Sequence, residues 1–180
     1  MFAALGRFAL CLAVLAGMAG AAAAQSIAPP AAGTLAPEFL LPDQDGNARN
    51  LREFQGHWLV IFFYRKADTP PAAAQAAGYR DSRDALDALG ARVVGVSTDD
   101  AALQGAFARK LKLDFPLLSD IEGEMARRYG SLVDFRVVRF SRRNTFLIDP
   151  QGKVARAYLG VDPPADPYRV LEDLKRLAGR

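Results

Sequence analysis

Sulfur is scarce in this sequence. Its 180 residues include one cysteine, Cys11, and three methionines. Cys11 lies in an N-terminal segment that we predict to be removed, so the mature chain would contain no thiol. A chain without a thiol has no disulfide, no cysteine-ligated metal and no thiolate nucleophile. The absence of cysteine also suits an oxidising compartment, where a stray thiol would risk mispairing.

Residues that hold metals or cofactors are also few. The only histidine, His57, comes just before a long apolar run, and we interpret it as an exposed residue at the entry to a strand. A single histidine cannot build a zinc or haem site without other ligands. The acids in "STDD" and "SDIEGE" lack the fixed spacing of a calcium loop, and no glycine-rich phosphate loop is present. We therefore predict no metal and no cofactor.

Charge is nearly balanced, with 23 Lys and Arg residues against 20 Asp and Glu residues, a net charge of +3. This balance favours neither nucleic acid nor a membrane surface as a partner. One local exception is the segment 127–143, "RRYGSLVDFRVVRFSRR", which has six arginines and one acid, Asp134. We interpret it as a solvated rim of strand and loop. The alternative is a surface that faces an anion.

The first 24 residues have the pattern of a secretory signal peptide. Arg7 is followed by an apolar stretch and then by small residues up to Ala24, so we predict cleavage before Gln25. The alternative is a retained membrane anchor. Residues 25–36 are rich in Ala and Pro and predict a linker, and the folded domain is predicted to span residues 37–180. The expected location is periplasmic or secreted, with no membrane contact after cleavage.

The first half of the predicted domain begins with a hairpin over residues 39–51, which turns at Asp45-Gly46. The run "HWLVIFFY" (57–64) is almost wholly apolar, which is typical of a strand buried on both faces of a sheet. A helix is expected to begin at Thr69 as its N-cap, because Pro70 and Pro71 suit the first turn. Helical spacing of the residues that follow continues this helix to Gly90.

The second half continues the alternation of strands and helices. Strands are predicted over residues 91–98 and 115–120, helices over 99–113 and around 122–129, a hairpin over 144–160 and a closing helix over 166–179. Such alternation predicts an α/β fold with a mixed central sheet flanked by helices on both faces.

From about residue 34 to residue 179, the chain resembles the peroxiredoxins, in particular the bacterioferritin-comigratory-protein or peroxiredoxin Q group. The resemblance rests on the stretches "APEFLLPDQDGNARNLREFQGHWLVIFFY", "KADTPPAAAQAAGYRD", "VVGVSTDD", "FPLLSD" and "RRNTFLIDPQGKV". It implies a thioredoxin-like fold, which agrees with the predicted order of elements.

The resemblance also implies where the functional residues would lie. In that family a Pro-x-x-x-Thr-x-x-Cys signature opens the helix after the buried strand, and its cysteine attacks peroxide. A resolving cysteine often follows five residues later. Here Arg65 stands at the proline position and Thr69 at the threonine. Ala72 stands at the peroxidatic position and Ala77 at the resolving position. The family's peroxide-binding arginine matches Arg143.

Without sulfur at these positions, peroxide reduction by the family mechanism is excluded, because neither a methyl group nor a hydroxyl has the oxidation chemistry of a thiolate. We predict a non-catalytic pseudo-peroxidase or binding module. The alternative is a thiol peroxidase-type antioxidant oxidoreductase, as family membership suggests. Thr69, Arg143 and the start of the helix could form a relic pocket for a small anion. A partner protein, such as another peroxiredoxin-like subunit, is a further candidate.

Overall fold

A five-stranded mixed sheet forms the centre of the computed structural model, which describes residues 28–135 and 137–179. The strand order is β5-β4-β3-β8-β9. β3 pairs in parallel with β4 and antiparallel with β8, and so joins the parallel and antiparallel halves. These strands are β3 (Trp58–Phe63), β4 (Ala91–Ser97), β5 (Leu117–Ser119), β8 (Thr145–Ile148) and β9 (Val154–Tyr158).

The central position of β3 explains its unbroken apolar sequence. Every residue from Leu59 to Phe63 is buried, so side chains that alternate between the two faces of the sheet all enter a core. Val60 and Phe62 face one core, and Leu59, Ile61 and Phe63 face the other.

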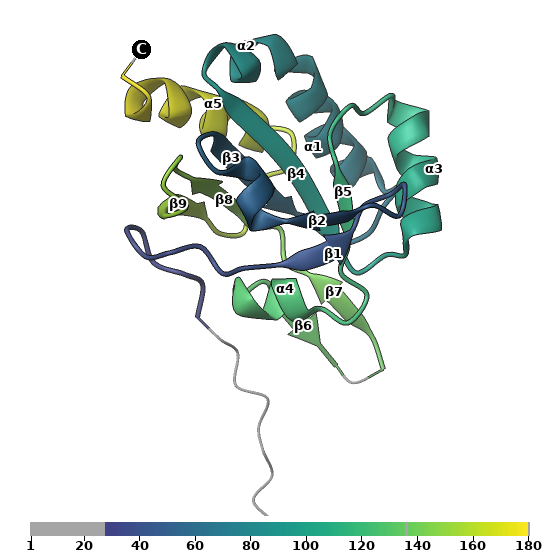
Figure 1. The fold of residues 1–180 in the computed structure, drawn as a ribbon. Helices are drawn as coiled ribbons and strands as arrows, with labels where there is room; N and C mark the ends of the chain where they lie inside the picture. The colour runs from purple at the N-terminus through teal and green to yellow at the C-terminus, as the bar shows by residue number, and fades with distance from the viewer. Residues whose placement is uncertain (1–27, 136, 180) are drawn as a thin grey trace, which may run out of the picture.

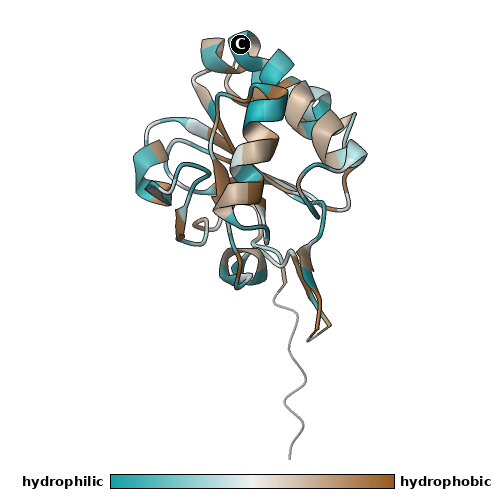
Figure 2. Ribbon diagram, turned by 90° about the vertical axis from the view of Figure 1, so that its right-hand side faces the viewer, coloured by the Kyte–Doolittle hydropathy of each residue, from teal (hydrophilic) through white to brown (hydrophobic). Residues whose placement is uncertain are grey.

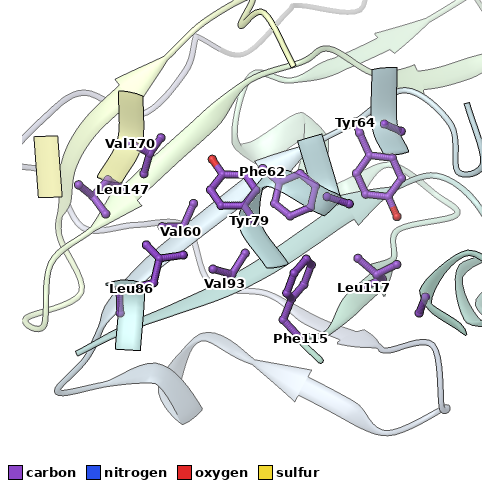
Figure 3. Packing of buried hydrophobic residues seen from close by; sticks show 14 of the residues in the cluster. Val60, Phe62, Tyr64, Tyr79, Leu86, Val93, Phe115, Leu117, Leu147 and Val170 are labelled. Atoms are coloured by element: carbon purple, nitrogen blue, oxygen red, sulfur yellow. The ribbon is translucent and has the colours of Figure 1, made fainter. Parts of the chain in front are cut away.

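Four helices cover one face of the sheet. Residues of α1, α2, α3 and α5 share a buried cluster with the inward side chains of β3. Figure 3 shows this cluster, in which Phe62 of β3 stacks on Tyr79 of α1 at 4.9 Å between ring centroids. The helices are α1 (Pro70–Asp81), α2 (Arg83–Ala88), α3 (Ala101–Leu111), α4 (Glu124–Arg128) and α5 (Asp166–Leu177).

The opposite face is covered by the N-terminal part of the domain and by α4. Phe39, Leu51, Met125 and Tyr129 are buried against this face. In Figure 1 the hairpin of β1 (Leu40–Pro42) and β2 (Ala48–Asn50) lies in front of the sheet and α1 behind it. A 3-10 turn, η1 (Leu51–Phe54), follows the hairpin. The predicted α/β, thioredoxin-like architecture with a mixed sheet is therefore confirmed.

The long helix predicted after Thr69 is two helices. The chain leaves helical geometry at Ser82, where φ is −90° and ψ is 5°, and α2 starts at the next residue. Arg83 forms ion pairs with Asp87 and Asp114, which hold the new helix in place. Leu86 of α2 lies in the core, where it is 1% exposed. The hydrophobic spacing correctly predicted helical structure on both sides of Ser82, but it does not reveal the break between the two helices.

The arginine-rich segment forms an additional hairpin. β6 (Leu132–Asp134) and β7 (Arg139–Ser141) pair antiparallel, with Leu132 opposite Ser141. This hairpin projects from the body of the molecule, and apolar residues colour part of it brown in Figure 2. Phe135 and Val138, near its turn, are 66% and 56% exposed. The predicted rim of strand and loop is thus a defined β-hairpin with exposed apolar residues.

The segment just before residue 37 is bonded to the sheet. Gly33 donates its N–H to the carbonyl of Val154 at 2.8 Å, and Ala36 donates to the carbonyl of Gly152 at 2.9 Å. These contacts lie within the predicted linker, so its last residues run along the edge of the fold. The predicted signal peptide lies outside the described residues. Among the helices of the described part, none has the length and apolar character needed to cross a membrane.

Candidate functional site

The N-terminus of α1 lies directly beyond the end of the central strand. Thr69 is its N-cap residue, as predicted, and Pro70 and Pro71 fill the first two helical positions. The Thr69 side chain makes no capping hydrogen bond to the helix, and its hydroxyl donates to the carbonyl oxygen of Lys66 at 2.9 Å. The first intrahelical bond runs from the Ala73 N–H to the Thr69 carbonyl at 2.9 Å. Both contacts end on backbone carbonyl groups within the turn.

Acidic side chains fix the loop between β3 and α1. The Asp99 carboxylate accepts the Ala67 N–H at 2.6 Å and the Ser97 hydroxyl at 2.8 Å. Lys110 of α3 forms an ion pair with Asp68 at 2.6 Å, and Asp68 itself has a φ of +56°. A non-glycine residue adopts this left-handed conformation only at a cost, so tertiary contacts must hold the loop in place.

The two alanines predicted to replace the family's cysteines lie on α1 in different environments. Ala72, at the third helical position, is 4% exposed and packs into the core formed by the helices and the sheet. Ala77 is half-buried, five residues further along the helix. Their side chains are methyl groups, which neither donate nor accept protons or electrons. The helix start is thus built around apolar contact at Ala72.

Arg143 lines an open cavity of about 730 Å³ together with Arg65 and Phe140, and Thr69 is not among the residues that line it. Arg65, which the resemblance places at the family's signature proline, has its guanidinium 4.3 Å from the centre of the Phe140 ring. The structure therefore brings Arg143 together with Arg65. The expected convergence of Thr69 and Arg143 on one anion stays a prediction.

A buried polar network links α1 to α5. One oxygen of the Asp166 carboxyl, Oδ2, accepts hydrogen bonds from Gln75, Tyr79 and Thr145 at 2.8, 2.7 and 2.7 Å. Burial raises the pKa of Asp166 above its ordinary value, and these three hydrogen bonds oppose the rise. Asp166 Oδ1 and Gln75 Oε1 are buried without a hydrogen-bond partner among the described residues. The network joins the helix of the candidate site to the C-terminal helix.

Sequence reasoning missed this network because its members are far apart in the chain. Asp166 is 91 residues from Gln75 and 21 from Thr145. Asp166 also begins an amphipathic helix, where an acidic residue is ordinarily explained by the helix dipole. The polar Gln75 among the alanines of α1 was the one available signal, since a polar residue on a buried face needs a partner.

His57 is half-buried, whereas the sequence predicted an exposed residue. It lines a cavity of about 220 Å³ with Leu59 of β3 and with Asp149, the residue after β8. Within residues 28–135 and 137–179, no group of three His, Cys, Asp or Glu side chains is placed to hold a metal ion.

A mixed sheet whose central strand leads into the N-terminus of a helix packed on that sheet is the architecture of a thioredoxin-like protein of the peroxiredoxin type. Residues 32–157 match the AhpC/TSA family. The chain is 40% identical over 131 residues to peroxiredoxin Bcp of Escherichia coli K12, an alignment that covers 71% of this chain and 84% of that protein. This chain belongs to the AhpC/TSA family, and within it to the Bcp and peroxiredoxin Q group.

Solved structures agree with this assignment. Peroxidoxin BcpB of Mycobacterium tuberculosis superposes with a TM-score of 0.78 at 31% identity, covering 82% of this chain and 98% of that one. A bacterioferritin comigratory protein of Xanthomonas campestris, studied for alkyl peroxide reduction, gives a TM-score of 0.73 at 31% identity. That match covers 78% of this chain and 92% of the Xanthomonas chain.

Proposed function

We propose that this chain is an exported, non-catalytic member of the peroxiredoxin family that acts as a binding module. The observation that supports this proposal is the side chain at position 72. The helix start that would hold the family's reactive sulfur carries a buried methyl group, and the sequence has no cysteine after Cys11. The family fold is retained, while the atom on which the resemblance places the chemistry is absent.

The remaining side chains do not replace that sulfur. Peroxide reduction requires a group that gives two electrons to oxygen and is then reduced again. The Thr69 hydroxyl is far less acidic than a thiol, and it is engaged with the Lys66 carbonyl. Met125 is the only methionine after Met18, and it is 2% exposed. A methionine sulfoxide is not reduced by a simple dithiol, so it would not support turnover.

The alternative is an antioxidant thiol peroxidase, the activity that the names of the relatives imply. It would require a thiol in the functional protein. The only one available is Cys11, which lies in the predicted signal peptide. Retention of that segment would leave Cys11 in the chain, more than 50 residues before the helix start.

The proposed location is the periplasm or the exterior of the cell, on the basis of the predicted signal peptide and the lack of cysteine in the mature chain. The proposed partners are a small anionic ligand or another protein, which includes another peroxiredoxin-like subunit. The balanced charge gives no support to nucleic acid as a partner.

Intact-mass measurement after peroxide treatment tests the proposal. The chain from Gln25 onward is expected to show no mass change that a dithiol reverses, because it has no thiol to form a sulfenic acid or a disulfide. Any added oxygen should be resistant to dithiol and should map to Met125. An Ala72→Cys variant treated in parallel is the positive control. A dithiol-reversible adduct on the wild-type chain would contradict the proposal.

A further inference from the structure

We propose that the cavity beside the β6–β7 hairpin binds a carboxylate that carries an acyl chain, such as a fatty acid. This inference rests on the proposed function, in which the fold binds and does not catalyse. The proposed ligand site is not the start of α1 but the cavity of about 730 Å³ lined by Arg65, Arg142 and Arg143. A volume of this size is within the range of small-molecule sites.

Unpaired positive charge gives the cavity its preference for an anion. Among the described residues that line it, three are arginines and none is acidic. In the part of the chain that the structure describes, none of the three lies within ion-pair distance of an acidic side chain. Arg139, on the same hairpin but outside the cavity, pairs with both Glu122 and Asp134. Guanidinium groups bind a carboxylate through two parallel hydrogen bonds, which makes this head group a close chemical match.

Apolar walls distinguish the ligand from a simple inorganic anion. Phe140, Leu159 and Val161 line the same cavity as the arginines. Leu159 is 58% exposed and Phe135, which also lines the cavity, is 66% exposed, so the cavity has an exposed apolar surface of the kind that marks a ligand-binding groove. A hydrocarbon chain would cover these side chains, whereas phosphate or acetate would leave them in contact with water. Charge and apolar surface together therefore favour an amphipathic monoanion.

The floor of the cavity is held by a buried side chain. Asn144 is 3% exposed, accepts the Gly160 N–H on its side-chain oxygen at 3.0 Å and donates to the Ser131 hydroxyl at 2.9 Å. Its backbone carbonyl accepts the Phe63 N–H at 2.8 Å. The neighbouring Arg143 accepts the Val161 N–H on its carbonyl at 2.8 Å. These contacts connect the arginine loop to the central strand, so the site is supported by the rigid part of the fold.

Calorimetric titration of the chain from Gln25 onward with dodecanoate tests the proposal. We expect one dodecanoate per chain with a dissociation constant below about 100 µM. Dodecanol, which has the same tail without the charge, is expected to bind at least tenfold more weakly, and acetate not detectably. Equal binding of dodecanoate and dodecanol would overturn the proposal, because the arginines would then contribute nothing.

Variants locate the binding site. Arg142→Gln is expected to weaken dodecanoate binding about tenfold, since it removes one charged hydrogen-bond donor. Arg139→Gln is the matched control, because this arginine of the same hairpin lies outside the cavity, and its affinity should equal that of the wild type. Leu159→Ser should weaken dodecanoate binding, because it removes an apolar side chain from the wall of the cavity. Equal effects of the Arg142 and Arg139 variants would overturn the assignment.

Two other results separate this inference from its alternatives. Binding to vesicles of anionic phospholipid without binding of monomeric dodecanoate would overturn it in favour of a lipid surface. A chain that fails to bind dodecanoate but also shows no peroxide chemistry would contradict the ligand and leave the non-catalytic function standing. Peroxide turnover with normal dodecanoate binding would contradict that function instead.

Discussion

We expect an Ala72→Cys variant to consume hydrogen peroxide in the presence of excess dithiol at least tenfold faster than an Ala77→Cys variant. Position 72 is in the first turn of α1, where the helix dipole stabilises an anion. A thiol with its ordinary pKa of about 8.5 is about 3% ionised at pH 7, and one whose pKa falls to about 7 is half ionised. The thiolate is the reactive form, so the rate follows this fraction.

Two features of the structure oppose this lowering of the thiol pKa at position 72. Pro70 and Pro71 offer no N–H groups, so the positive end of the helix has fewer donors than usual. Ala72 is also 4% exposed, and burial in apolar surroundings raises the pKa of a thiol. We expect the helix dipole to lower the thiol pKa by more than these two features raise it. The N–H group of Ala72 makes no hydrogen bond to a backbone carbonyl of the loop before α1, so it can still stabilise an anion at this position.

The Ala77→Cys variant is the matched control because it places the same side chain on the same helix, away from its N-terminus. Ala77 is half-buried, so its thiol is at least as accessible to peroxide. The measurement is the rate of peroxide loss across pH 5 to 9, which also yields the pKa of each thiol. Equal rates and equal pKa values would show that this helix start no longer activates sulfur, and that more than the cysteine has been lost.

An Asp166→Ala variant is expected to lose about 3 kcal/mol or more of unfolding free energy. The substitution leaves the donors of Gln75, Tyr79 and Thr145 buried without an acceptor, and each such donor costs about 1 to 3 kcal/mol. Part of this loss is offset because an ionised carboxyl no longer has to be buried. Denaturation by urea, followed by circular dichroism, measures the change.

Asp166→Asn is the control for this network. It keeps a side-chain oxygen that can accept hydrogen bonds from the three donors, and it removes the ionisable group. Its amide nitrogen also offers a donor at a place where the wild type has two unpaired acceptors, Asp166 Oδ1 and Gln75 Oε1. We expect its unfolding free energy at pH 7 to be within about 1 kcal/mol of the wild-type value. A loss as large as that of Asp166→Ala would show that the geometry of a carboxylate, rather than an acceptor, is required.

The raised pKa of Asp166 gives this comparison a pH dependence. The folded state binds the Asp166 proton more tightly than the unfolded state does. Protonation of Asp166 therefore stabilises the fold, and this contribution is largest below the ordinary pKa of 3.8. That contribution is lost as the pH rises through the higher folded-state value. The wild type should therefore become less stable relative to Asp166→Asn as the pH rises from 4 towards 7. Comparing the two proteins removes the effect of Asp120, whose pKa burial also raises.

Local patterns predicted the elements that depend on near neighbours. The unbroken apolar run of β3 indicated a central strand, and Pro70 and Pro71 located the start of α1. The same reasoning did not find the break at Ser82, since both helices keep the same hydrophobic spacing. For the segment that forms the β6–β7 hairpin, the sequence predicted strand and loop but not the pairing of two strands, because its arginines and exposed apolar residues do not alternate clearly between two faces.

The candidate site was predictable only in part. Thr69, Ala72 and Ala77 lie on and before one helix, so a sequence motif places them together. The grouping of Arg65 with Arg143 joins residues almost 80 positions apart, and the Phe140 ring that receives Arg65 belongs to the hairpin that the sequence did not reveal. The partners of Asp166 are equally distant. Contacts of this kind depend on the packing of the whole chain and have no local signal.

The steady-state consumption of hydrogen peroxide by the wild-type chain from Gln25 onward, measured with excess dithiol, tests most directly whether this protein is non-catalytic. We expect a rate equal to that of the dithiol alone and independent of protein concentration, because the chain from Gln25 onward has no cysteine and so no sulfur that can cycle between oxidised and reduced forms. A rate that rises in proportion to protein concentration and continues through many turnovers per chain would contradict it.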